Sequence, residues 1–61
     1  METRLLTTQE VFDVYELAPK DQKYAAVERA TGKSREELAA IPFVEFNICL
    51  QKVLEENGLD S

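Results

Sequence analysis

The side chains that could do chemistry in this chain are few, and two pairs of adjacent carboxylates are the first to consider. Glu36–Glu37 and Glu55–Glu56 are residue types that could act together as acid and base. Neighbouring residues on a helix point about 100° apart, however, and no apolar run surrounds these pairs to raise a carboxyl pKa. Both pairs are typical of helix ends and solvated surface, so we predict no catalytic residue there.

Residues suited to nucleophilic catalysis or metal binding are equally scarce. The chain has no histidine and a single cysteine, Cys49, which leaves no Cys/His or Ser/His pair, no internal disulfide and no ligand set for zinc. Cys49 falls in the middle of a helical pattern and is expected to be a small buried hydrophobe. With only Gly32 and Gly58, a glycine-rich phosphate loop is excluded. We therefore expect no enzyme, no metal and no cofactor.

The elements that would position any site are predicted to be helices. Thr7–Glu10 and Ser34–Glu37 have the spacing of a capping box, which predicts a helix over residues 8–17 and a short one over residues 35–40. Pro19 should end the first helix. Lys20–Asp21 should open a second helix, which runs to about Thr31 and ends at Gly32. Pro42 should occupy the first turn of a last helix that ends near Glu56, with Gly58 as its cap.

Apolar side chains at helical spacing predict which faces are buried. The expected core comprises Val11, Val14, Tyr15 and Ala18, then Tyr24, Val27 and Thr31 with Ala26 and Ala30 between them, and finally Phe43, Phe46, Leu50, Val53 and Leu54. The predicted fold is a single all-α domain over residues 1–61, a compact bundle of three main helices plus one short helical turn. Residues 1–5 and 59–61 are expected to fray.

The charge balance narrows the classes of partner. Seven basic against twelve acidic residues give a net charge of −5, which disfavours nucleic acid and anionic membranes. A helix-turn-helix over residues 27–38 would have to read DNA with Arg35 beside Glu36 and Glu37, which provides few contacts. A DNA mimic is disfavoured too, because basic residues alternate with the acids.

No run approaches the roughly 18 apolar residues of a membrane helix, and Leu5–Leu6 is too short a core for a signal peptide. A cytoplasmic location is expected.

Three apolar side chains fall outside the predicted core faces. Val44 and Ile48 lie one turn apart on the last helix, well off its main stripe, and Phe12 lies about 100° from the stripe of the first helix. Two interpretations stay open. The bundle could bury these side chains as well, or they could form a surface that binds a protein partner or another copy of the chain. A domain this small buries only about 60% of the surface that its unfolded chain exposes, which favours completion by a partner and formation of an oligomer.

Two further runs carry a resemblance to a known family. Residues 30–38 (A-T-G-K-S-R-E-E-L) and 41–46 (I-P-F-V-E-F) resemble a pattern of small tail assembly chaperones of tailed bacteriophages, x-T-G-K-S-x-E-E-[IL] followed by x-[LI]-P-x-x-E-[FY]. Residues 6–10 (L-T-T-Q-E) are similar to the Leu-Thr-x-x-Glu entry to the first helix of that family. The likeness covers about residues 6–54.

The resemblance implies an all-helical assembly factor of the host cytoplasm with no enzymatic activity. Such chaperones hold the helical tape measure protein and the tail tube subunit soluble before the tail polymerises, and they often self-associate. A second function from a different class stays open, namely a small acidic inhibitor, encoded by a phage or another mobile element, that covers a surface of a host regulatory or defence protein. In either case Phe12, Val44 and Ile48 are the predicted partner-binding residues.

Overall fold

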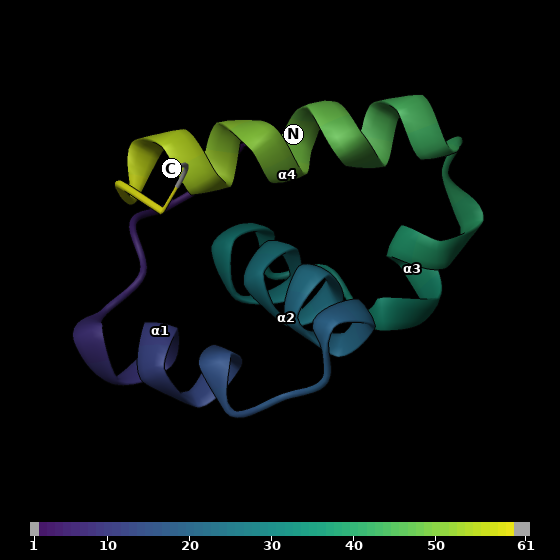
Figure 1. The fold of residues 1–61 in the computed structure, drawn as a ribbon. Helices are drawn as coiled ribbons and strands as arrows, with labels where there is room; N and C mark the ends of the chain where they lie inside the picture. Colours follow the sequence, from purple (N-terminus) through teal and green to yellow (C-terminus); the bar gives the residue numbers. More distant parts are fainter. Residues whose placement is uncertain (1, 60–61) are drawn as a thin grey trace.

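The computed structural model describes residues 2–59, which contain four α-helices and no β-strand. The helices are α1 (Thr8–Tyr15), α2 (Pro19–Thr31), α3 (Arg35–Ala40) and α4 (Phe43–Glu56). In Figure 1, α2 runs through the middle of the molecule, α4 lies across it, and α1 and α3 lie on its two sides. The predicted all-α bundle of three main helices and one short helix is confirmed.

Both predicted capping boxes are present. The Glu10 amide donates to the Thr7 hydroxyl at 3.2 Å, and the Thr7 amide donates to the Glu10 carboxylate at 3.0 Å. Ser34 and Glu37 make the same two bonds at 3.2 and 3.1 Å. These bonds satisfy amide donors that have no partner within the helix, so α1 and α3 begin where the sequence predicts.

Two glycines end the long helices in the left-handed conformation. Gly32 has φ +78° and its amide donates to the Glu28 carbonyl at 2.8 Å, which ends α2. Gly58 has φ +68°, and the next amide, that of Leu59, donates to the Leu54 carbonyl at 2.8 Å. This six-to-one bond is the mark of a Schellman motif. Both predicted caps are confirmed.

The boundary between the first two helices differs from the prediction. α1 ends at Tyr15 instead of Leu17, and α2 begins at Pro19 instead of Lys20. The fixed φ of proline suits the first helical position, while the residue before it is held extended. The side-chain amide of Gln22 donates to the Tyr15 carbonyl at 3.2 Å and to the Leu17 carbonyl at 2.8 Å. These two carbonyls therefore have hydrogen-bond partners without a further helical turn.

The core gathers around α2, on which the other three helices pack. Small side chains on α2 let α4 approach closely, and the Tyr24 ring lies 5.4 Å from the Phe46 ring. The buried cluster comprises Ala26, Val27, Ala30, Leu38, Phe46, Cys49, Leu50 and Val53. The predicted burial of Cys49 is therefore confirmed.

Three of the predicted core positions are wrong. Phe43 is 75% exposed and Tyr15 is 55% exposed, and Ala18 is exposed in the link after α1. Pro42 takes the cap position, so Phe43 is the first residue of α4, and it is turned about 60° from the buried Phe46.

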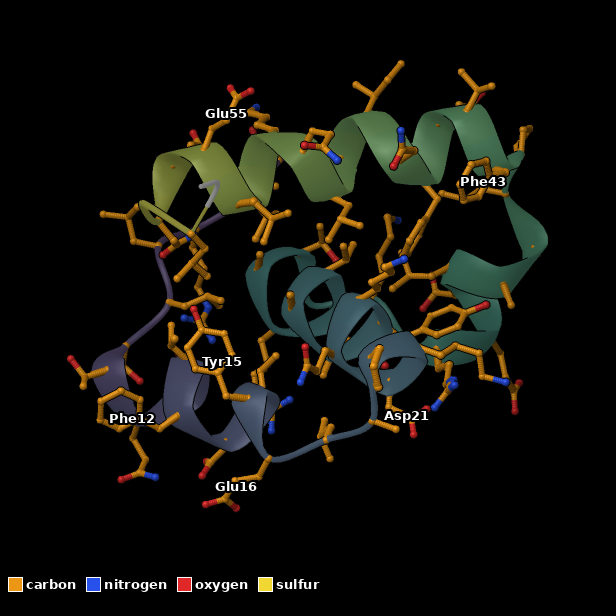
Figure 2. All side chains as sticks on the ribbon, in the orientation of Figure 1. Phe12, Tyr15, Glu16, Asp21, Phe43 and Glu55 are labelled. Atoms are coloured by element: carbon orange, nitrogen blue, oxygen red, sulfur yellow. The ribbon has the colours of Figure 1, made fainter. Side chains whose placement is uncertain are left out.

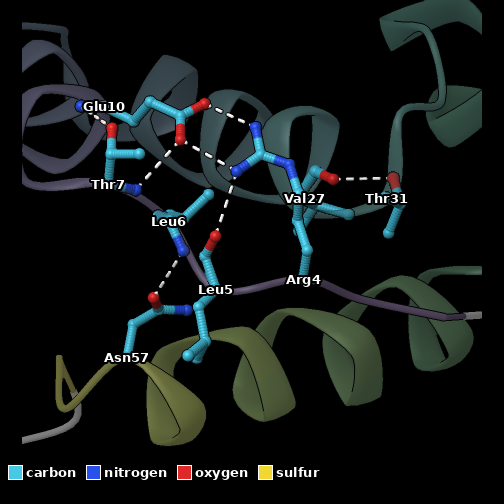
Figure 3. A network of polar contacts seen from close by, with 8 residues as sticks. All are labelled: Arg4, Leu5, Leu6, Thr7, Glu10, Val27, Thr31 and Asn57. Carbon is cyan, nitrogen blue, oxygen red and sulfur yellow. Dashed lines mark hydrogen bonds and ion pairs between the residues drawn. The ribbon is translucent and has the colours of Figure 1, made fainter.

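An extended segment before α1 joins two helix ends (Figure 3). The Arg4 amide donates to the carbonyl of Ala30 near the end of α2, at 2.8 Å. Two residues further on, the Leu6 amide donates to the side-chain oxygen of Asn57 just after α4, also at 2.8 Å. Hydrogen bonds thus hold Arg4, which lies in the segment predicted to fray, and Leu6, which follows that segment. Met1 and residues 60–61 lie outside the described residues.

Candidate protein-binding surface

An apolar groove lies between α1 and α4, with the first half of α2 as its floor. Its volume is about 350 Å³. Figure 1 shows the helices that form its walls, α4 at the top and α1 at the lower left. The lining residues are Leu6, Val11, Val14, Tyr15, Pro19, Gln22, Lys23, Ala26, Phe43, Phe46, Asn47, Leu50, Gln51, Leu54 and Leu59.

The groove exists because α1 and α4 both pack on α2. Ala26 on the floor is buried and too small to fill the space between the two helices. From α1, the Tyr15 ring points towards α4, and Phe43 stands at the opposite wall (Figure 2). Both rings are exposed, so the groove is an open apolar surface with aromatic side chains on its two walls.

The polar groups of the groove are few and mostly neutral. Lys23 is the only charged residue that lines it, and Lys23 forms no ion pair with any residue in the described range 2–59. The side chains of Asn47 and Gln51 make no hydrogen bond to any of those residues either, while that of Gln22 is occupied by two carbonyls. An incoming segment would therefore meet one free cation, two free amides and the hydroxyl of Tyr15 in an otherwise apolar site.

The three residues predicted to bind a partner are all exposed, but they do not form one patch. Val44 is 68% exposed and Ile48 is 64% exposed, one turn apart on α4; we refer to this pair as the outer stripe. The alternative that the bundle buries this pair is thereby excluded. Phe12 is 58% exposed and points away from α4 (Figure 2). None of the three lines the groove.

The groove itself was missed by reasoning from the sequence, which assigned its two wall rings, Tyr15 and Phe43, to the core. One signal could have drawn attention to Phe43. It directly follows Pro42, so it was bound to lie in the first turn of its helix, where fewer neighbours can cover a large side chain. For Tyr15, no local sequence pattern predicts that α1 ends at that residue.

The shorter of the two ion pairs in the described residues lies at the start of α1, away from the groove (Figure 3). Arg4 donates two hydrogen bonds to the Glu10 carboxylate, at 2.9 and 2.6 Å. These bonds, together with the amide of Thr7, lower the pKa of Glu10 to about 2 and raise the pKa of Arg4. The amide and hydroxyl of Ser34 likewise lower the pKa of Glu37. These carboxylates act as helix caps.

Arg35, the basic residue considered above for DNA contacts, is engaged within the fold. It donates to Asp21 of α2 at 2.8 Å, and its guanidinium carbon lies 4.3 Å from the centre of the Tyr24 ring. Within residues 2–59, no group of three or more Cys, Asp or Glu side chains is placed to hold a metal ion. Nor is any helix in that range long and apolar enough to cross a membrane.

Comparison of the chain with protein-family models, with curated proteins and with solved structures gives no match. The case for a function therefore depends on the two apolar surfaces, the groove and the outer stripe.

Proposed function

We propose that this chain is a non-enzymatic protein-binding factor, and specifically a phage-type tail assembly chaperone that acts in the host cytoplasm. The single observation that carries the proposal is the presence of two separate apolar surfaces, the groove and the outer stripe, on a chain of 61 residues. Exposed apolar surface of this kind usually marks a site of interaction. Two such surfaces suit a factor that handles two proteins, as the tape measure and tail tube subunits require.

The motifs behind the resemblance have a clear structural role. Gly32 ends α2 and Ser34 begins α3, so the T-G-K-S run makes the sharp connection between these helices. The second run starts α4 and carries both Phe43 of the groove and Val44 of the outer stripe. The residues that support the resemblance thus place the apolar side chains on which the proposed binding depends.

Co-expression with candidate partners tests this function. The chain should be captured with tape measure and tail tube proteins in a pull-down, and failure to capture either protein would overturn the chaperone assignment. Capture of a host regulatory or defence protein in their place would support the inhibitor function. A tube gene upstream and a tape measure gene downstream are the expected genome neighbours.

The outer stripe has its own test in the double variant Val44→Asp/Ile48→Asp. Both side chains are exposed, so the variant should keep the helical circular dichroism of the wild type. It should lose capture of one partner by at least about tenfold, the effect of some 1.4 kcal/mol of lost contacts. Leu5→Asp, an apolar-to-acid change at an exposed leucine outside α4, is the matched control and should capture normally. Capture that survives in the double variant, together with a strictly monomeric chain at high micromolar concentration, would exclude the outer stripe as an interface.

A further inference from the structure

We propose that the groove binds an amphipathic helix of a partner protein, which runs antiparallel to α4 and sets a carboxylate against Lys23. The inference rests on the proposed function in one respect, that the chain works by binding proteins. It adds the conformation of the bound segment, its direction and its chemistry.

The length of the groove fits a helix. Phe43 and Leu54, both on the α4 wall, are about 16 Å apart at the helical rise of ~1.5 Å per residue, which is three turns. A partner helix could place side chains at i, i+3, i+4, i+7 and i+11 against this wall. Because α1 and α4 both pack on α2, a helix laid between them would contact all three and complete a bundle.

The chemistry of the lining favours a helix over an extended peptide. An extended segment needs partners for its own amides and carbonyls, and burial without them is costly. The described residues offer no β-strand edge, and the free polar side chains in the groove are those of Tyr15, Lys23, Asn47 and Gln51. A helix satisfies its backbone internally and requires only that the groove accept its apolar face.

The charge at one end of the groove sets the direction. Lys23 lies at the same end as Phe43, since the two residues also line a neighbouring pocket together. Both α2 and α4 begin at this end, at Pro19 and Phe43, and helix N-termini carry a partial positive charge. The carboxyl end of a bound helix, with its negative partial charge, is therefore favoured here. An Asp or Glu in its last turn would reach the amine of Lys23.

A second copy of the chain is a poorer occupant than a partner helix. Each copy carries a net charge of −5, so two copies repel each other. The outer stripe has two exposed side chains one turn apart on α4, about 6 Å by the helical rise, and would leave most of the groove empty.

Selection from a displayed library of 18-residue helical peptides with one randomised face tests the inference directly. The selected peptides should carry apolar residues at helical spacing and an acidic residue in the last turn. Binding of the synthesised peptides to the full chain, followed by fluorescence anisotropy, should weaken at least tenfold in Tyr15→Glu. Leu5→Glu, an equally drastic change at an exposed leucine outside the groove, should bind as the wild type does.

A charge exchange tests the direction. Lys23→Glu should weaken binding of the acid-ended peptide by about two- to fivefold, the range of an exposed ion pair, and a lysine-ended peptide should recover it. Lys52→Glu makes the same charge change outside the groove and should have no such effect.

The proposal would be overturned if no peptide were enriched, or if the selected sequences lacked apolar residues at helical spacing. It would also be overturned if the selected acid lay in the first turn, or if binding survived Tyr15→Glu. Sedimentation in which Tyr15→Glu turns a dimer into a monomer would assign the groove to a second copy instead. Because the peptides are selected without phage proteins, the groove can succeed here even if the chaperone function fails in the pull-down.

Discussion

At the scale of single residues, Glu10 does more than its place in the sequence indicates. The capping box accounts for its bonds with Thr7, but the structure adds a bidentate pair with Arg4 from the segment before the helix. One carboxylate therefore caps α1 and also fixes the segment that joins the ends of α2 and α4 (Figure 3).

This arrangement predicts a pH dependence of stability. The pKa of Glu10 is about 2 in the folded chain against 4.5 for the free group, so the unfolded state binds the proton more readily. The stabilisation is therefore complete above about pH 5 and is lost as the pH falls towards 2. Thermal unfolding of Glu10→Gln should show a lower midpoint than the wild type at neutral pH, with the difference vanishing near pH 2.

The control for this experiment is Glu36→Gln, which removes the same charge. The side chain of Glu36 makes no hydrogen bond or ion pair to another residue in the range 2–59. The unfolding midpoint of Glu36→Gln should therefore differ little from that of the wild type at neutral pH. An equal effect of both variants would mean that net charge, and not the Arg4–Glu10 pair, sets the acid sensitivity.

At the scale of the elements, each helix is bounded by local chemistry and positioned by α2. The caps depend on residues three to five positions apart, so they form from local sequence alone. The packing of α1, α3 and α4 on α2 depends on contacts between residues that are distant in sequence.

The cap of α2 gives a prediction for one substitution. Gly32 has φ +78°, and a Cβ added there would meet no atom within 4 Å. Gly32→Ala should therefore cost about 1–2 kcal/mol of unfolding free energy through backbone strain alone, measured by urea denaturation. Asn tolerates this conformation better, so Gly32→Asn should lose less. Equal losses in both variants would contradict an origin in the left-handed backbone.

At the scale of the whole molecule, the small core makes stability depend on a few side chains. A single core in a chain of this length rarely supplies more than about 3–5 kcal/mol. The buried residues lie almost entirely on α2 and α4, with Leu38 as the contribution of α3 and Val14 as that of α1. Losing one large member should remove most of the stability.

Two phenylalanines three residues apart test this view of the core. Phe46 is 8% exposed and packs on Tyr24, so Phe46→Ala should cost about 3–5 kcal/mol and leave the chain largely unfolded at 25 °C. Phe43 is 75% exposed, so Phe43→Ala should change the free energy of unfolding by no more than about 0.5 kcal/mol. Circular dichroism and urea titration would measure both. A large loss of unfolding free energy in Phe43→Ala would mean that Phe43 is buried in the core, as the sequence predicted, and does not line an open groove.

Much of the fold could be predicted because its signals are local. The capping boxes at Thr7 and Ser34 and the glycine caps at positions 32 and 58 each arise from a few neighbouring residues, and all four have the predicted geometry. The apolar stripe of α4 likewise predicted the burial of Phe46, Leu50 and Val53. Periodicity also identified Val44 and Ile48 as lying off that stripe, and both are exposed.

Only the tertiary structure decided where the binding surfaces lie. Helical periodicity shows which way a side chain points from its own axis, but whether another helix covers it depends on the length and crossing of that helix. α1 ends at Tyr15, whose carbonyl accepts from the side chain of Gln22 seven residues away, and both Tyr15 and Phe43 line the open groove. The sequence by itself thus determined four capped helices and an apolar face on each long one, whereas the packing of those faces around α2 determined which apolar side chains stay free for a partner.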